Sequence, residues 1–196
     1  MRGLRTAGES VALPGRGVLG MWIFLATDAA GFGGLLIAYG ALRSRAASWP
    51  DPHQRFSLVL AAAMTFTLLA SSLTMSLAVG GAQRGGRRAA LAWLGATVFA
   101  GLAFLGGAAV EYSHLLSGAP AVALTTDLPA SVFYVITGFH GVHVIAGLIY
   151  LAALLVSGAR GRQLAPGTWE VAALFWHFVD FAWVAIFFAL YLLPTV

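Results

Sequence analysis

The stretch ASVFYVITGFHGVHVIAGLIYLAALLVS, residues 130–157, contains no Asp, Glu, Lys or Arg and is almost entirely apolar. About 20 such residues in a helix cross the hydrocarbon core of a bilayer, so this stretch predicts a membrane-spanning helix. Inside it, the motif Thr137-Gly138-Phe139-His140-Gly141-Val142-His143 places two imidazoles at a depth where polar side chains are costly. These histidines therefore need buried partners.

Four further stretches share this length and composition. The five predicted spans are about 17–42, 57–82, 89–110, 130–157 and 169–193. Prolines and glycines fall in the connections between them, and the alternating ten-residue segments typical of membrane β-barrels are absent from the sequence. We therefore predict an all-α integral membrane protein, with one five-helix transmembrane domain over residues 17–196 and a cytoplasmic tail over residues 1–16.

The composition excludes several classes of protein. With 60% hydrophobic and 9% charged residues, the chain has too little polar surface to cover a water-soluble globule. All 11 basic residues are arginines, and they lie between the apolar stretches, which argues against a nucleic-acid-binding surface. The absence of cysteine removes disulfides, thiolate metal sites and iron–sulfur clusters.

The arginines also predict the direction in which the chain crosses the membrane, because cytoplasmic loops are enriched in basic residues. One side holds the N-terminal tail and the loops near 83–88 and 158–167, with eight arginines: Arg2, Arg5, Arg16, Arg84, Arg87, Arg88, Arg160 and Arg162. The other side holds three arginines offset by three acids: Arg43, Arg45 and Arg55 with Asp51, Asp127 and, nearby, Glu111. We expect a cytoplasmic N-terminus and an external C-terminus.

Asp28 lies about eleven residues into the first predicted span, near the middle of the bilayer. An ionised carboxylate costs about 2.5–3.5 kcal/mol there, so we expect it to be protonated or paired inside the protein. Three roles fit such an acid: a buried polar contact between helices or subunits, a proton relay, and a contact with a lipid headgroup. The first is favoured.

His140 and His143 are three residues apart and therefore lie on one side of the fourth span. Two imidazoles at this spacing could share a metal ion, and one of them could bind haem iron. His177, in another span, is the only obvious third ligand. The favoured interpretation is structural, with each histidine hydrogen-bonded to a backbone carbonyl or a carboxylate.

The last span contains the motif Trp176-His177-Phe178-Val179-Asp180, and Glu170 lies seven residues before His177. Helical spacing places Glu170, His177 and Asp180 on one face, where a carboxylate could orient the imidazole. We favour contacts between helices over proton conduction for these side chains. Trp169, Trp176 and Trp183 repeat every seven residues beside them and predict packing, with Trp169 at a membrane interface.

Several other polar or small residues carry weaker signals. We expect Glu111, with Tyr112, at the solvated outer end of the third span, and we count it among the contact residues. Hydroxyl groups in the second span can bond to carbonyls of their own helix: Ser71, Ser72 and Thr74. Glycines inside the spans predict close helix packing: Gly31, Gly33, Gly34, Gly101, Gly106, Gly107, Gly138, Gly141 and Gly147.

Together these motifs resemble subunit III of the haem-copper cytochrome c and quinol oxidases, in its short five-helix bacterial form. The resemblance rests on the two histidine motifs and on isolated positions elsewhere, and it runs over about residues 18–193. The family signature residues are Trp22, Thr137, Gly138, Phe139, His140, Gly141, His143, Trp176, His177, Phe178, Asp180 and Trp183.

The chain departs from the family pattern at a few positions. Asp28 stands where the family usually has Glu, which keeps the acid and shortens its reach. Met64 replaces an expected Asn, Ala108 an expected Gln, and Phe175 an expected Tyr. Each of these last three replacements removes a polar contact.

The resemblance implies an accessory subunit of an aerobic terminal oxidase in the bacterial inner membrane. Such a subunit has no redox cofactor or metal of its own, since haem and copper belong to its partners. It binds phospholipid, packs on the catalytic subunit I with subunit II, and helps to sustain proton uptake. A small subunit IV and a larger respiratory supercomplex are left open as further partners.

Three alternatives remain open from the sequence. A subunit-III-like protein of a nitric oxide reductase system would share the five spans. A haem-binding membrane anchor would use His140, His143 or His177 as axial ligands. A transporter would use Asp28 and Asp180, but the sequence lacks the inverted repeats and broken helices typical of that class.

Overall fold

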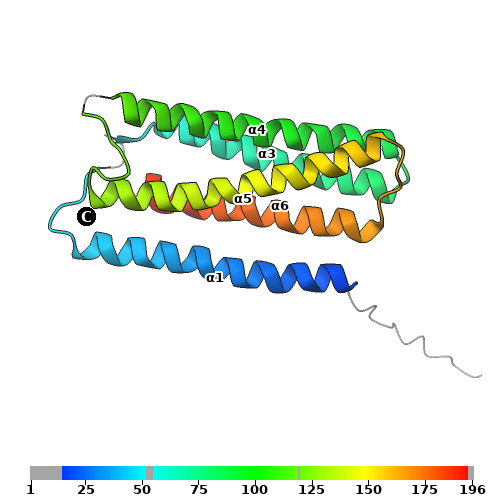
Figure 1. Cartoon of the computed structure of the whole chain (residues 1–196), viewed down its shortest axis with the longest axis horizontal. Coiled ribbons are helices and arrows are strands. Elements are labelled where there is room, and N and C mark those ends of the chain that lie inside the picture. Colours follow the sequence, from blue (N-terminus) through cyan, green and yellow to red (C-terminus); the bar gives the residue numbers. More distant parts are fainter. Residues whose placement is uncertain (1–14, 52–54, 119, 194–196) are drawn as a thin grey trace, which may run out of the picture.

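The structure, a computed structural model, describes residues 15–51, 55–118 and 120–193. Within these ranges, five helices are long and apolar enough to cross a membrane, which confirms the all-helical, five-span prediction (Figure 1). Their bounds are α1 Arg16–Arg45, α3 Leu58–Gln83, α4 Arg87–Ser117, α5 Leu128–Ala159 and α6 Pro166–Phe187, and a π-helical turn, η1, Phe188–Leu192, extends α6. The predicted tail lies almost wholly outside the described residues, so the division into tail and single domain stays a prediction.

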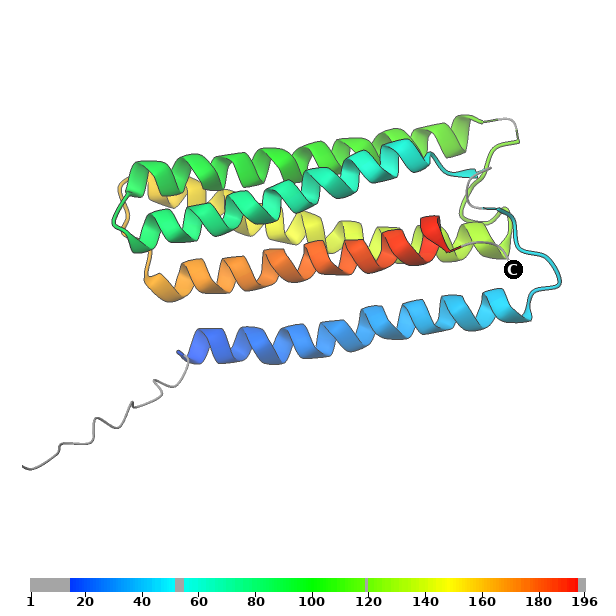
Figure 2. The same ribbon diagram turned by 180° about the vertical axis from the view of Figure 1, so that it is seen from behind.

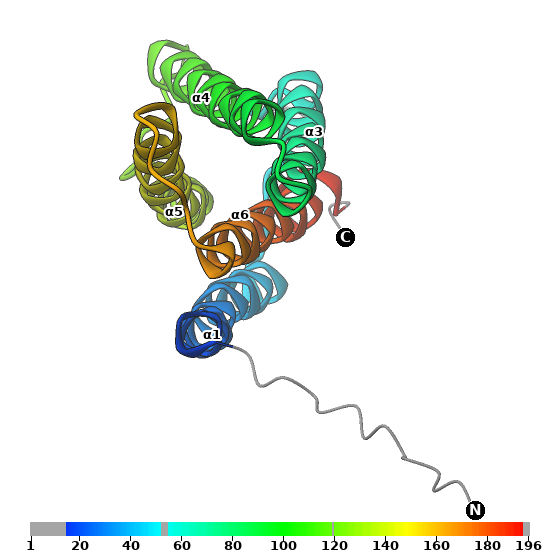
Figure 3. The same ribbon diagram turned by 90° about the vertical axis from the view of Figure 1, so that its right-hand side faces the viewer.

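The helices run side by side and alternate in direction along the long axis of the molecule (Figures 1 and 2). Viewed along that axis, α3, α4, α5 and α6 form a ring, and α1 lies outside the ring beside α6 (Figure 3). The main contacts of α1 are with α6 and α5. Its buried hydrophobic residues are Leu25, Phe32 and Tyr39, which repeat every seven residues and form one narrow contact stripe.

The largest difference from the predicted bounds concerns α4. This helix continues to Ser117, well past the predicted end near residue 110, because no helix breaker occurs before Gly118. The hydroxyls of Ser113 and Ser117 donate to carbonyls of their own helix, which satisfies them inside the extra turns. Glu111 is therefore not at a helix end.

Helices α3 and α5 end in the same kind of turn, at the same end of the bundle (Figure 1). Gly85 and Gly161 have φ angles of 73° and 92°, the left-handed region that glycine tolerates best. In both turns the next residue donates its backbone N–H to the carbonyl five residues earlier. Tight turns of this type end both helices with an arginine at the cap, Arg84 and Arg160.

The contact between α3 and α6 is held by two indole groups. Trp176 Nε1 donates to Ser71 Oγ at 2.9 Å, and Trp183 Nε1 donates to Thr65 Oγ1 at 3.0 Å. Both tryptophans are almost completely buried, so an indole N–H without an acceptor would be costly there. Ser71, a weak signal in the sequence, is thus an acceptor between helices as well as a donor to its own helix.

The predicted role of the glycines in close packing is correct for only some of them. A Cβ atom on Gly101 would lie 2.7 Å from atoms of Leu148 and Trp176, and one on Gly147 would lie 2.9 Å from Phe175. Gly107 lies equally close to the side chain of Met64. Within this chain the prediction is wrong for the glycines that face open space: Gly31, Gly33, Gly34, Gly106, Gly138 and Gly141.

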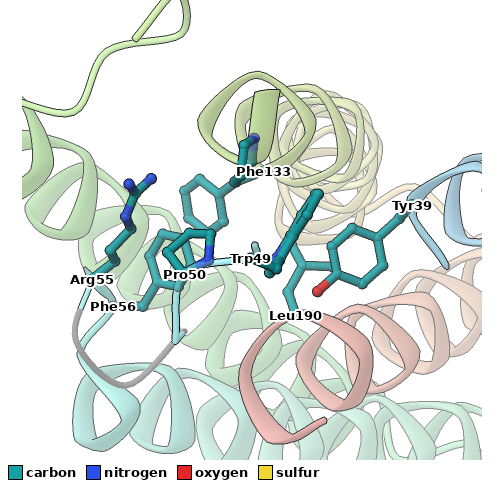
Figure 4. Close-up of a pocket in the computed structure, with 8 residues that line it drawn as sticks. Tyr39, Trp49, Pro50, Arg55, Phe56, Phe133 and Leu190 are labelled. Carbon is teal, nitrogen blue, oxygen red and sulfur yellow. The ribbon is translucent and has the colours of Figure 1, made fainter. Parts of the chain in front are cut away.

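At the end of the bundle opposite the Gly85 and Gly161 turns, described residues of the connection between α1 and α3 pack on these helices and on α5 (Figures 1 and 4). Phe56 stacks on Phe133 of α5 with ring centroids 4.2 Å apart, and Tyr39 of α1 contacts Trp49 edge to face at 5.6 Å. Arg55 forms an ion pair with Asp127 at 2.7 Å. Aromatic packing and a neutralised charge pair therefore fix this end.

Replacing Gly101 with alanine tests the close approach of α4 to α5 and α6. The added methyl group meets a buried leucine and a buried tryptophan, so Gly101→Ala should destabilise the protein by about 1–3 kcal/mol. Gly106→Ala in the same helix is the matched control, because its Cβ would meet open space. Thermal unfolding in detergent measures both, and equal midpoints would contradict the packing at Gly101.

Candidate functional site

An acid and an imidazole meet between α1 and α5, about midway along both helices. His143 Nε2 lies 3.2 Å from Asp28 Oδ1 and 3.1 Å from Asp28 Oδ2. The two side chains are 13% and 12% exposed. The other ring nitrogen of His143, Nδ1, lies 2.8 Å from the backbone carbonyl oxygen of Phe139. Asp28 therefore has a partner in this chain, and the partner is a histidine of the signature motif.

These contacts decide how protons are arranged at the pair. A carbonyl oxygen only accepts hydrogen bonds, so Nδ1 of His143 carries a hydrogen. The bond to Asp28 then holds one more proton, either on Nε2, giving an ion pair, or on the carboxyl group, giving two neutral partners. Both arrangements have no net charge, which lowers the cost of placing the pair in a bilayer. A single proton can also move between the two groups.

Phe32 of α1 packs on this pair and on the second histidine of the motif. Its ring centroid lies 5.2 Å from that of His143, 6.2 Å from that of His140 and 4.8 Å from that of Phe139. An apolar ring beside the pair excludes water from one side of it. The sequence analysis did not single out Phe32, although it lies four residues after Asp28, on the same helical face.

His140 differs from its neighbour because it is completely buried and neither of its ring nitrogens has a hydrogen-bond partner among the described residues. Its ring lies 5.1 Å from Trp183 and 5.6 Å from Phe104, which it meets edge to face. The prediction that each histidine bonds to a carbonyl or a carboxylate is wrong for His140. Aromatic side chains from three other helices surround the imidazole of His140. Its neighbours are therefore aromatic rings and not hydrogen-bond acceptors or donors of the usual kind.

His177 contacts α3 through two hydroxyl groups, and not through a carboxylate or a carbonyl as expected. Its Nδ1 lies 2.6 Å from Ser72 Oγ, and its Nε2 lies 3.4 Å from Ser76 Oγ. The Ser76 hydroxyl donates to the carbonyl of Ser72, so it can only accept from Nε2. A neutral ring with its hydrogen on Nε2, accepting from Ser72 at Nδ1, satisfies all these groups.

Asp180 and Glu170 do not bond to His177: no hydrogen bond or ion pair joins any two of these three in the described ranges, so a carboxylate does not orient the imidazole as suggested. Asp180 is 3% exposed, and neither of its oxygens has a hydrogen-bond partner among the described residues. The hydroxyls of Ser71 and Ser72 lie next to Asp180, while Ser71 also donates to the Leu68 carbonyl and Ser72 contacts Nδ1 of His177. Glu170 is exposed near the start of α6.

Glu111 is buried, 4% exposed, and not at the solvated helix end that the sequence suggested. Tyr191 of η1 donates its hydroxyl to Glu111 Oε2 at 2.7 Å, whereas Oε1 has no partner in the described part of the chain. This hydrogen bond joins the end of the last span to α4. The signal missed in the sequence was the absence of a breaker after Tyr112, which keeps Glu111 inside the helix.

Beside Glu111 lies an apolar cavity of about 360 Å³ between α4 and α5. Gly138 and Gly141 of the signature motif line it, as do Met64 and Ala108, which stand at family positions expected to be polar. Next to it, Thr137 donates to the carbonyl of Phe133, so the 2.7 Å contact between Thr137 and Tyr112 is donated by the tyrosine.

The histidines are a poor fit for a metal ion or haem. The described residues contain no group of three or more His, Cys, Asp or Glu side chains placed to hold one metal ion. Both nitrogens of His143 and of His177 make hydrogen bonds, and aromatic rings enclose His140. A haem ligand needs a free nitrogen with space for a porphyrin next to it.

These features define a multi-pass helical membrane protein whose intramembrane polar side chains lie mainly at contacts between helices. The sequence profile described as Cytochrome c oxidase subunit III matches residues 16–194. The chain belongs to this family, which confirms the resemblance seen in the sequence.

Named relatives come from cytochrome c oxidases and quinol oxidases. The chain is 37% identical to "Cytochrome c oxidase subunit 3" of Synechocystis sp. over 90% of its own length and 75% of that protein. It is 34% identical to "Cytochrome bo(3) ubiquinol oxidase subunit 3" of Pseudomonas aeruginosa, with 91% and 86% covered. It is 36% identical to "Probable cytochrome c oxidase subunit 3" of Mycobacterium tuberculosis, with 93% and 91% covered.

Removing the hydroxyl of Tyr191 tests the contact that anchors the last span. Tyr191→Phe leaves the buried carboxyl of Glu111 without its donor and should destabilise the protein by about 1–3 kcal/mol. Tyr150→Phe is the matched control, because that partly buried tyrosine makes no hydrogen bond within the described residues. Thermal unfolding in detergent compares the two, and an unchanged midpoint for Tyr191→Phe would contradict the contact.

Proposed function

We propose that this chain is an accessory subunit III of a haem-copper terminal oxidase, without a redox centre of its own. In this role it stabilises the catalytic subunit and supports proton uptake during aerobic respiration. Family membership and relatives named for both cytochrome c and quinol oxidases support the assignment. The observation that carries the proton-related part is the buried pair of Asp28 and His143 at mid-span.

The distribution of charge supports an N-terminus in the cytoplasm and a C-terminus outside, in the inner membrane of a bacterium. The end of the bundle at which α1, α4 and α6 begin carries six arginines of the described residues: Arg16, Arg84, Arg87, Arg88, Arg160 and Arg162. At the other end, Arg55 is neutralised by Asp127. Basic residues favour the cytoplasmic side of a membrane.

Helix α1 supplies a surface suited to a partner in the membrane. It buries the smallest share of its apolar span among the five helices, 11%, against 28–44% for the others. The open glycines Gly31, Gly33 and Gly34 lie along it, and small residues let a second helix approach closely in lipid. We propose that subunit I, the catalytic subunit, is the main partner, with subunit II, a small subunit IV and phospholipid completing the assembly.

Purification through a tag on this chain tests the assignment. In mild detergent, the chain should bring with it a catalytic subunit that carries haem and copper, seen by absorption spectroscopy and mass spectrometry. The isolated chain should show no Soret band, because the imidazoles of His140, His143 and His177 inside the spans are hydrogen-bonded or enclosed. Purification without any haem-containing partner, or a Soret band from the chain alone, would reject the proposal.

Replacing Asp28 with asparagine tests its part in proton supply. Asp28→Asn keeps a polar contact to His143 but cannot hold the proton, so the oxidase should assemble and turn over more slowly or lose activity sooner during sustained catalysis. Asp28→Glu keeps the acid and should preserve both properties. Oxygen consumption over many turnovers provides the measurement. Wild-type behaviour of Asp28→Asn would leave the pair as a helix contact only.

A further inference from the structure

We propose that the apolar cavity beside Glu111 is a binding site for the ring of an isoprenoid quinol, held by a hydrogen bond to that carboxyl group. The cavity measures about 360 Å³, and small-molecule sites commonly measure about 300–1,000 Å³. Residues of four helices line it: α3, α4, α5 and α6. Such a ligand belongs to this chain alone, and its binding requires neither the oxidase assembly nor a redox centre.

Glu111 supplies the polar group that the ligand would complete. Its side chain is in the wall of the cavity and is buried, and its Oε2 accepts from the hydroxyl of Tyr191. Its Oε1 has no hydrogen-bond partner among the described residues. A buried polar atom without a partner is costly, so a ligand that bonds to Oε1 gains affinity. A hydroxyl can donate to a carboxylate and accept from a carboxylic acid, so it fits Oε1 in either protonation state.

Aromatic rings and glycines give the cavity walls that suit a flat ring. Phe104, Tyr112 and Trp183 line it, and aromatic rings pack well on one another edge to face or offset. Gly138 and Gly141 also line it, and a Cβ atom on either would meet open space. A backbone without side chains lets a ligand approach closely. The walls therefore favour an aromatic ligand, and the ring of a quinol carries two hydroxyl groups.

The cavity opens toward lipid. Val142 and Ile145 line it and are 64% and 47% exposed. Both lie near the middle of α5, so the cavity reaches the surface of the bundle at the level of the hydrocarbon core. A neutral ligand dissolved in the membrane can enter there, and its isoprenoid tail can remain in the lipid.

Other molecules of the membrane fit this cavity less well. An acyl chain fills apolar space but leaves Oε1 of Glu111 without a partner. A phosphate headgroup places negative charge next to an acid, and no arginine is among the described residues that line the cavity. A partner helix, about 10–12 Å in diameter, can cover the opening but is too wide to enter. An oxidised quinone only accepts hydrogen bonds, so it fits Oε1 only when the acid is protonated.

The first test compares ligands on the full-length chain, purified in detergent without its partners and kept free of oxygen. Decylubiquinol and a short-chain menaquinol are tested separately by native mass spectrometry, and at least one should bind saturably. The dimethyl ether of the bound quinol has a similar shape but cannot donate. It should bind about tenfold more weakly, the factor that corresponds to one hydrogen bond. Phosphatidylcholine in excess should not displace the quinol.

The second test locates the site by filling it. Ala108 lies three residues before Glu111 on the same face of α4, and both line the cavity. Ala108→Gln adds a side chain that occupies the cavity and can bond to Oε1 of Glu111, so quinol binding should fall about tenfold or more. Ala103→Gln is the matched control, because this exposed alanine is in the same helix and does not line the cavity.

Several results would overturn the proposal: no saturable binding of either quinol, equal binding of the quinol and its dimethyl ether, displacement by phosphatidylcholine, or equal losses in Ala103→Gln and Ala108→Gln. The comparison of ligands uses the unaltered chain, so it remains decisive if Ala108→Gln fails to fold. Quinol masses are scored on the isolated chain, independently of any haem-containing partner. Failure of this site and failure of the oxidase assignment therefore give different results.

Discussion

The bilayer core offers no water to polar side chains, and this constraint governs how the helices of this protein are joined. A polar group buried in lipid must find its partner on a neighbouring helix or within its own. Trp176 and Trp183 bond α6 to hydroxyls of α3, and His143 bonds α5 to Asp28 of α1. These contacts supply a directionality that apolar packing in lipid lacks, because lipid tails are as apolar as leucine.

Three buried polar groups lack complete pairing within the described residues, and their positions are informative. His140 and Asp180 lie inside the ring of helices, and Glu111 keeps one free oxygen beside a cavity lined by Met64 and Ala108. By resemblance, the family carries polar residues where those two stand. The loss of polar side chains thus coincides with an acid whose pairing is incomplete, which links the sequence departures to one place in the fold.

The two ends of the bundle differ in charge and in packing. One end is closed by aromatic stacking and by the neutral pair of Arg55 and Asp127 (Figure 4). The other carries an excess of arginine around two tight glycine turns and a cavity between them. An asymmetric distribution of charge favours one orientation of a helical bundle in a membrane over the other.

The sequence by itself determined the helical class, the five spans and the family, because long apolar runs and fixed motifs are local properties that need no tertiary contact. Tertiary structure alone decided which polar groups meet. Helical spacing placed His177 and Asp180 on one face, but the distance to a partner depends on how α6 is rotated against α3. In the structure His177 contacts Ser72, and the carboxyl oxygens of Asp180 have no hydrogen-bond partner within the described part of the chain. Likewise, the pairing of Asp28 with His143 joins residues far apart in the chain, and only the packing of α1 against α5 could reveal it.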